Sequence, residues 1–281
     1  MLYTIIINGN DEKLKLWDRE HFMDQDLFNR LFSLKRKTAL ITGSYRGIGL
    51  EIAETYAEAG ADVALVARDL SKCQTAAQKI ADKYGVRAIG KSMDVHDSMA
   101  VDAVVQEVVD EFGKIDILVN SAGISGSEKP VLEMTDEDLD DVMDVDFRGT
   151  FLVSRAVAKE MTKHQPGKII NVASLAGKIA TPNMSGYCAG KAAVIHLTRV
   201  MALELMRYNI QVNVLCPGYF LTKFNRDFFE SDIGKRAIKR NIPMNRVGRL
   251  EELQSTALYL ATCPVFLTGA ELYIDGGHGI V

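Results

Sequence analysis

The stretch "TGSYRGIGLEIA" at residues 42–53 decides the fold. The apolar run "TALIT" leads into it, and a helical pattern follows it. Gly43, Gly47 and Gly49 let the backbone turn tightly and approach a bound group closely. Such a turn needs glycine for structural reasons as well, but its place after the first strand favours a dinucleotide site, with a pyrophosphate at the helix N-terminus.

From Lys37 onward, short apolar runs alternate with helical patterns. The runs expected to be strands are 38–42, 61–67, 86–93, 114–119, 167–173, 210–216 and 270–275. The helical patterns lie at 49–59, 71–83, 97–112, 136–163, 187–208 and 249–262. Continuous apolar strands alternating with helices favour a parallel sheet covered on both faces. We predict one doubly wound α/β domain of Rossmann type over residues 34–281, preceded by an N-terminal extension at 1–33 that lacks a clear period.

Composition narrows the classes of protein. The 281 residues have a formal net charge of −4, which gives no reason to expect nucleic acid or an anionic membrane as a partner. The four cysteines lie far apart without a C-x-x-C pair, so neither a disulfide framework nor a metal site is indicated, and a reducing cytoplasm fits. The short apolar run near the N-terminus has no basic segment before it, so we expect neither a signal peptide nor a membrane span.

The end of the second strand bears on the choice of dinucleotide. An acidic residue there suits the ribose hydroxyl of NAD, whereas arginine accommodates the 2′-phosphate of NADP. Here the strand ends in Ala67-Arg68, and Arg46 lies in the glycine turn. Two guanidiniums near one phosphate favour NADP. Arg68 could instead pair with Asp69, and Asp69 keeps NAD open as the alternative.

The stretch "SGYCAGKAAV" at 185–194 places Tyr187 and Lys191 four residues apart. In an α-helix these side chains lie on one face, one turn apart. An adjacent ammonium favours the phenolate, so it lowers the pKa of a tyrosine from its usual value of about 10. Such a phenol can give or take a proton near neutrality. For this pair alone, a half-buried ring beside a solvated lysine is the plainer alternative.

Seven motifs, in order and spanning nearly all of residues 37–277, resemble the short-chain dehydrogenase/reductases. They are "TGSYRGIG" at 42–49, "MDV" at 93–95, "VNSAG" at 119–123, "NVASLAG" at 171–177, "YCAGK" at 187–191, "CPGYFLT" at 216–222 and "YIDGG" at 273–277. The resemblance implies a seven-stranded parallel sheet and hydride transfer between NAD(P)H and a small-molecule carbonyl or alcohol. It also implies a homo-oligomer, a dimer or tetramer.

The resemblance assigns roles to individual residues. Tyr187 would be the acid/base, Lys191 would hold the nicotinamide ribose, and Ser174 would orient the substrate oxygen, although a loop-capping hydroxyl is the simpler reading of that serine alone. The cofactor contacts it implies, besides Tyr187 and Lys191, are Gly43, Ser44, Arg46, Gly47, Ile48, Gly49, Arg68, Asp94, Val95, Asn120, Ala122, Gly123, Pro217, Gly218, Phe220 and Thr222.

Two positions depart from the family pattern. Ser121 stands where the family usually has a second asparagine, at a position that supports the sheet. Asp146 stands where an asparagine often completes the catalytic set behind the lysine. An ionised aspartate accepts hydrogen bonds but cannot donate one. We therefore expect Asp146 to strengthen the charge on Lys191 and to leave activity with an altered pH profile.

Residues 223–249, where the family builds a substrate lid, hold eight basic and three acidic residues. This local excess of five positive charges hints at an acidic substrate, such as a sugar acid or an acyl group on a carrier protein. A solvated helix or a subunit contact explains it equally well. Stretches of the sequence resemble both gluconate 5-dehydrogenases and 3-oxoacyl carrier-protein reductases. A dinucleotide-binding regulator without catalysis is the alternative from another class.

Overall fold

The computed structural model describes residues 25–164, 166–223 and 225–280. Residues 34–281 form one compact unit, and residues 1–33 form another. The described part of the N-terminal unit contains one helix, α2 (Gln25–Phe32). Its apolar pattern extends over only eight residues, which is too short to stand out from the sequence. The rest of the expected extension, residues 1–24, lies outside the described residues.

Seven parallel strands form one sheet in the order β3-β2-β1-β4-β5-β6-β7. They are β1 (Thr38–Thr42), β2 (Asp62–Ala67), β3 (Ala88–Ser92), β4 (Ile117–Asn120), β5 (Gly167–Val172), β6 (Ile210–Pro217) and β7 (Glu271–Ile274). The predicted doubly wound fold and all seven strands are confirmed. The strand order reverses between β1 and β4, so the loops that follow these two strands part there and open a crevice.

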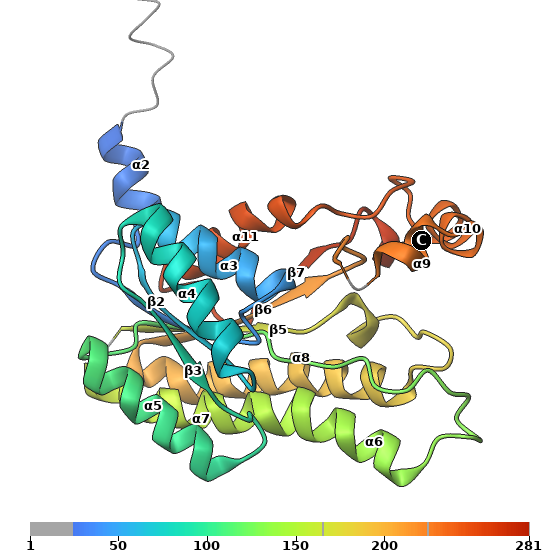
Figure 1. The fold of residues 1–281 in the computed structure, drawn as a ribbon, viewed down its shortest axis with the longest axis horizontal. Coiled ribbons are helices and arrows are strands. Elements are labelled where there is room, and N and C mark those ends of the chain that lie inside the picture. The colour runs from blue at the N-terminus through green and yellow to red at the C-terminus, as the bar shows by residue number, and fades with distance from the viewer. Residues whose placement is uncertain (1–24, 165, 224, 281) are drawn as a thin grey trace, which may run out of the picture. The chain divides into compact units, whose positions relative to one another are not determined.

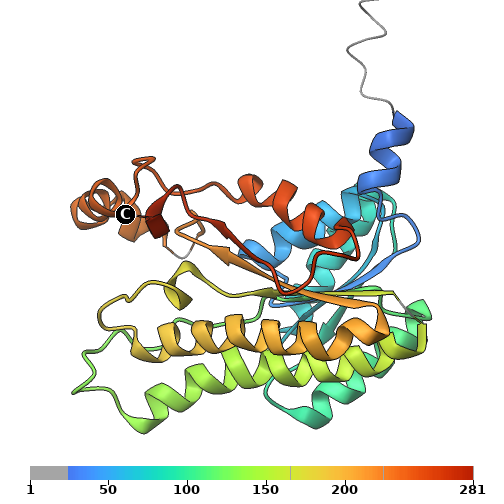
Figure 2. The ribbon, with the colours of Figure 1, turned by 180° about the vertical axis from the view of Figure 1, so that it is seen from behind.

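Helices cover both faces of the sheet (Figures 1 and 2). One layer consists of α3 (Gly47–Glu58), α4 (Leu70–Tyr84) and α11 (Gln254–Thr262), and the other of α5 (Ser98–Phe112), α7 (Thr150–His164) and α8 (Ser185–Leu205). Side chains alternate along each strand, so Ile41 joins the first core with Ile52 of α3, while Leu40 joins the second with Val157 of α7. Burial on both faces explains why the strands are continuously apolar.

The helix predicted at 136–163 is interrupted. Thr135 and Asp138 form a capping box that starts α6 (Asp136–Val142). The turn from Met143 to Gly149 is a π-helix, η1, and the regular helix α7 begins after it. Wider π turns occur mostly at functional sites. This one holds Asp146.

The segment after β6 folds into two helices that the sequence did not reveal, α9 (Arg226–Glu230) and α10 (Asp232–Asn241). They lie at one end of the sheet, beside the C-terminal strand β7 (Figure 1). The chain then passes through η4 (Leu250–Leu253) into α11. Among the described residues, no helix is both long and apolar enough to cross a lipid bilayer.

Candidate active site

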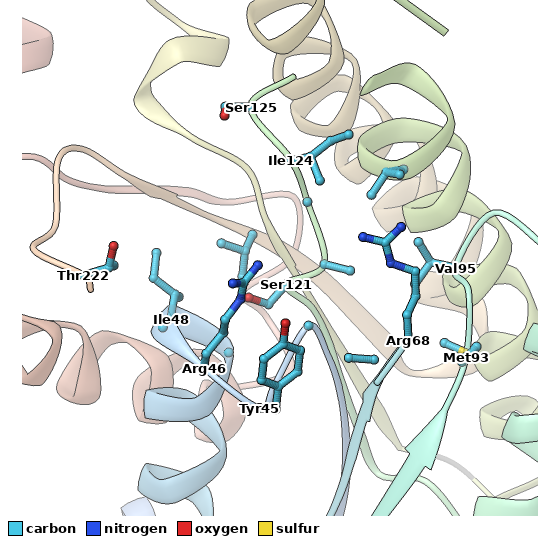
Figure 3. A pocket seen from close by; sticks show the side chains of 18 of the residues that line it. Tyr45, Arg46, Ile48, Arg68, Met93, Val95, Ser121, Ile124, Ser125 and Thr222 are labelled. Atoms are coloured by element: carbon cyan, nitrogen blue, oxygen red, sulfur yellow. The ribbon is translucent and has the colours of Figure 1, made fainter. Parts of the chain in front are cut away.

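A cavity of about 480 Å³ lies in the crevice at the carboxyl ends of the central strands. Figure 3 shows side chains from the glycine turn, from the ends of β2 and β4, and from the loop after β6 around it. The predicted site residues that line it are Gly43, Arg46, Gly47, Ile48, Gly49, Arg68, Asp94, Val95, Ala122, Gly123, Tyr187, Lys191 and Thr222. The structure thus brings most of the predicted set to one place.

The glycine turn presents backbone atoms to the cavity without side chains covering them. Gly43 has φ +63°, and a Cβ there would approach Ala122 Cα to 2.8 Å. A Cβ on Gly49 would approach the Gly43 carbonyl oxygen to 2.5 Å. Only glycine fits such spacing, and the first turn of α3 then points its amide groups outward. These features suit the pyrophosphate of a dinucleotide.

Two arginines reach into the cavity near the end of β2. Arg46 rises from the glycine turn and Arg68 from the end of β2, and Tyr45 lies between them in the view (Figure 3). The guanidinium of Arg46 lies 5.2 Å from the centroid of the Tyr45 ring. This end of the cavity is therefore cationic and suits an anionic group.

Asp69, the acidic residue beside these arginines, is engaged elsewhere. Its carboxylate caps α4, accepting hydrogen bonds from Lys72 N–H at 3.1 Å and from Ser71 Oγ at 2.7 Å. The Lys72 ammonium lies 2.7 Å from it, and this contact with Lys72 chiefly holds the pKa of Asp69 well below its usual range. The structure shows this pair with Lys72 and no ion pair with Arg68 within the described chain.

The other end of the cavity contains Tyr187 and Lys191, on the first turns of α8. Lys191 Nζ lies 5.5 Å from the centroid of the Tyr187 ring and 3.4 Å from the carbonyl oxygen of Val172, to which it donates. It also lies 3.0 Å from Asp146 Oδ2, and both side chains of this ion pair are buried. Burial opposes the lysine's charge, but the Asp146 carboxylate together with the nearby Tyr187 and Cys216 side chains raises the pKa of Lys191.

Asp146 is fully buried in the π turn η1. Its Oδ1 accepts a hydrogen bond of 2.8 Å from the backbone N–H of Ile124, which ties the turn to the loop after β4. Its Oδ2 faces Lys191. The residue that departs from the family pattern is thus joined directly to the predicted catalytic lysine. An aspartate suits both partners because each of them donates.

Ser174 follows β5 and starts the short helix η2 (Leu175–Gly177). Its Oγ accepts a 3.1 Å hydrogen bond from Ala176 N–H. This helix packs directly on α8, because a Cβ on Gly177 would come within 2.8 Å of the Lys191 carbonyl carbon. The turn that carries Ser174 is therefore seated against the helix that carries Tyr187 and Lys191.

Five predicted cofactor residues do not line the cavity, namely Ser44, Asn120, Pro217, Gly218 and Phe220. Ser44 Oγ donates to Ile41 O at 2.7 Å and accepts from Val66 N–H at 2.9 Å, so it joins β1 to β2. The Asn120 side chain is buried among other polar groups, and the buried Phe220 ring packs on Gly248. These side chains hold the walls of the cleft together.

Other residues line the cavity without having been predicted. They are Tyr45, Ala67, Asp69, Met93, Ser121, Ile124, Ser125, Val145, Val172 and Ala173. All except Val145 lie at the end of a strand or within five residues after it, so only their position could have marked them. Ser121 donates its backbone N–H to Thr42 Oγ1 at 3.1 Å, which joins the loop after β4 to the end of β1.

The fold and the cleft together define a dinucleotide-binding protein with a Tyr–Lys pair at one end of the dinucleotide cavity. A family model described as short chain dehydrogenase matches residues 37–232. The chain belongs to the short-chain dehydrogenase family and is an oxidoreductase of that family.

Curated relatives align along most of their length. The chain is 35% identical over 250 residues to 5-keto-D-gluconate 5-reductase of Escherichia coli (strain K12), covering 89% of this chain and 98% of that protein. It is also 35% identical over 246 residues to a 3-oxoacyl acyl-carrier-protein reductase of Vibrio cholerae, covering 87% and 98% of the two chains.

Solved structures agree in fold. A gluconate 5-dehydrogenase from Burkholderia cenocepacia in complex with NADP and tartrate is 37% identical, with a TM-score of 0.86, covering 90% of this chain and 99% of that one. An NAD⁺-bound xylitol dehydrogenase is 34% identical with a TM-score of 0.82, covering 87% and 99%. Relatives thus bind NADP or NAD.

Proposed function

We propose that this chain interconverts the carbonyl and secondary alcohol of a small sugar acid with NADP(H), and that Tyr187 is the acid/base. One observation carries the proposal. Tyr187 and Lys191 lie on one face of α8 at the end of the cleft, with the Ser174 turn packed on the same helix. The Ser174 side chain does not line the cavity. The proposed reaction needs a proton donor, a cation and a second hydroxyl, and Tyr187, Lys191 and Ser174 are the residues that would supply them.

A nicotinamide cofactor, when bound in this cleft, would supply or accept the hydride. The Tyr187 phenol gives a proton to the carbonyl oxygen in reduction and takes it back in oxidation. Ser174 Oγ already accepts from Ala176 N–H, so its own proton is left to donate to the substrate oxygen and orient it. Lys191 stabilises the phenolate and reaches the ribose hydroxyls, while Asp146 anchors its ammonium.

The preference for NADP rests on the opposite end of the cleft. Arg46 and Arg68 reach into the cavity there, as groups that bind a 2′-phosphate do. Asp69, the residue that favoured NAD, is held by Ser71 and Lys72 as the cap of α4. The NADP complex of the gluconate 5-dehydrogenase relative supports this choice, and the NAD⁺-bound xylitol dehydrogenase keeps NAD as the alternative.

The substrate class rests on the charge of the lid. Four basic residues of α10 are exposed, and the described structure gives none of them an acidic partner. Three other lid arginines, Arg226, Arg246 and Arg249, have acidic partners. An unbalanced cationic helix favours an anionic substrate. The gluconate-type relatives point to a sugar acid.

A 3-oxoacyl thioester on an acidic carrier protein is the second candidate. The same face of α10 would suit it, because a carrier protein meets the outside of the lid rather than its interior. The relative from Vibrio cholerae supports this reading. The two candidates differ in where the negative charge lies, next to the reacting carbon or far from it.

We extend the proposal to the organisation of the protein. Residues 34–281 are the catalytic domain, residues 1–33 are an extension, and the protein works in the cytoplasm as a homo-oligomer. The exposed apolar side chains Val200, Leu203 and Met206 near the end of α8 are suited to a contact between subunits. Light scattering of the purified chain tests the oligomer.

Oxidation of NADPH and of NADH is measured with 5-keto-D-gluconate, with acetoacetyl thioesters of coenzyme A and of acyl carrier protein, and with a neutral ketose. We expect the keto acid with NADPH to be the fastest pair. Faster turnover of the carrier-bound thioester favours the second candidate. If NADPH binds but no compound is reduced, the chain is a dinucleotide-binding regulator and the catalytic proposal is wrong.

A further inference from the structure

A chain of buried polar side chains runs beneath the catalytic residues. Asn120 of β4 donates to Ser154 Oγ of α7 at 2.7 Å and to Asn171 Oδ1 of β5 at 2.9 Å. Asn171 in turn donates to Thr198 Oγ1 of α8 at 2.8 Å. All four residues are at most 3% exposed. We call Asn120, Ser154, Asn171 and Thr198 the buried polar chain.

The buried polar chain joins the elements on which the site depends. Asn171 lies three residues before Ser174 on the same strand and its connection. Thr198 lies seven residues, two helical turns, after Lys191 on the buried face of α8. Ser154 lies eight residues after Asp146, beyond the π turn. The hydrogen bonds of the buried polar chain therefore connect β4, β5, α7 and α8. Lys191 lies on α8, Asp146 lies in the π turn that leads into α7, and Ser174 lies in the turn that follows β5.

Apolar packing alone does not fix how far a helix is shifted along a sheet. Apolar contacts depend on the buried area rather than on direction. Hydrogen bonds between buried groups are directional, and an unpaired buried amide is costly, so a shift of α8 along β5 would be opposed by loss of the bond from Asn171 to Thr198. Thr198 also donates to Val194 O at 2.9 Å, which fixes the orientation of its hydroxyl within α8.

We propose that the buried polar chain is a positioning device for the reaction proposed above, in which Thr198 and Asn171 set the register of α8 against β5. This register sets the distance between the Tyr187 phenol and Ser174. Nearer the start of α8, the helix η2 contacts α8 at Gly177, where there is no room for a side chain. The buried polar chain and this close contact together restrict α8 to a single position along β5.

The main test compares Thr198→Val with Thr198→Ser. Valine has nearly the same shape as threonine but removes the acceptor of Asn171, whereas serine keeps it. With 5-keto-D-gluconate and NADPH, we expect Thr198→Val to lower kcat about tenfold, since small misplacements of reacting groups have such effects. We expect KM and the NADPH dissociation constant to stay within about twofold, and Thr198→Ser to restore kcat.

Asn213→Leu is the matched control. Asn213 is a buried asparagine of the neighbouring strand β6, 1% exposed, and its side chain too is hydrogen-bonded. It donates to Leu267 O at 3.2 Å and to Cys263 Sγ at 3.9 Å, and it accepts from Ala270 N–H at 2.9 Å. We expect Asn213→Leu to lower the melting temperature as Thr198→Val does, but to keep kcat. If kcat falls equally in both variants, or in neither, the positioning role is wrong.

A measurement without substrate separates this inference from the proposed function. Cys188, next to Tyr187 on α8, is half-buried, whereas Cys73, Cys216 and Cys263 are buried. Its rate of labelling by a disulfide reagent therefore reports on the first turn of α8. If the parent reduces no compound tested, the proposed function fails, and the labelling rate decides this inference. Labelling several-fold faster in Thr198→Val than in Thr198→Ser and Asn213→Leu supports it, and equal rates overturn it.

Discussion

Each end of the cleft has an ion pair, and the two pairs differ in how far they are exposed to water. At the Tyr187 end, Lys191 and Asp146 form an ion pair whose side chains are 7% and 0% exposed. At the Arg68 end, Lys72 and Asp69 form a pair whose side chains are 61% and 35% exposed. Charges interact strongly where water is excluded and weakly where it is not. The buried end is therefore suited to control the chemistry, and the exposed end to select the cofactor.

Replacing the phenol tests the buried end most directly. Tyr187→Phe removes the proton donor but leaves the ring, so we expect turnover to fall by roughly 10²–10⁴-fold. The NADPH dissociation constant should change less than about twofold. Steady-state rates and cofactor fluorescence measure the two quantities. Tyr259→Phe, an exposed phenol on α11, is the control and should keep full activity; a Tyr187→Phe variant that keeps more than a tenth of the rate would contradict the role.

Breaking each ion pair sharpens the comparison. Lys191→Met leaves the Asp146 carboxylate buried without its partner, which should cost about 3–5 kcal/mol of unfolding free energy. The double variant Lys191→Met/Asp146→Asn removes both charges and should regain much of this loss. Lys72→Met at the exposed pair should leave the urea midpoint nearly unmoved. Equal losses at the two ends would show that burial does not distinguish them.

Removing an arginine tests the exposed end. Arg68→Ser deletes one charge-assisted contact to a 2′-phosphate, so we expect the NADPH dissociation constant to rise about 10–100-fold. The NADH dissociation constant should change little, because NADH has no phosphate at that position. Titration with both cofactors measures the ratio. A parallel loss for NADH would mean that Arg68 supports the pocket rather than the phosphate.

The smallest expected effect is a change in pH dependence. Against the effect of burial, the Asp146 carboxylate raises the pKa of Lys191. A carboxylate paired with an ammonium also offsets the field that the ammonium exerts on its surroundings. In Asp146→Asn that field is no longer offset, so the phenolate forms more readily. The rising limb of the oxidative rate should then move to lower pH by about one unit. An unmoved pH–rate curve would show that the aspartate acts only as a hydrogen-bond acceptor.

The sheet and its helices were predictable because their signals are local. The five inner strands are mostly apolar runs of a buried parallel sheet, and motifs in family order located the cleft. The match of "YCAGK" to the first turn of α8 gave the Tyr187–Lys191 pairing in the same way. Periodicity also placed the helices to within a few residues at most ends.

Features that depend on tertiary contacts were not predictable. The π turn at Asp146 looks like ordinary helix in sequence, and the amphipathic pattern of α10 is brief and interrupted by Gly234. Asp69 could be read from the sequence as a ribose ligand or as a partner of Arg68, whereas its hydrogen bonds and ion pair show it as the cap of α4. Ser44 was predicted from its motif, but its hydroxyl is used between strands.

The π turn also constrains how the length of this chain can vary. It accommodates one residue more than a regular helix would, so the halves before and after it are rotated by about 100° relative to each other. Leu139 and Val142 thereby face Gly186 of α8, where a Cβ would lie 3.5 Å from Leu139 and 3.7 Å from Val142. Deleting a single residue within Met143–Gly149 would bring both halves into one phase and turn this face away from α8. Insertions and deletions should therefore be tolerated in the loop at 125–134 and selected against in this turn.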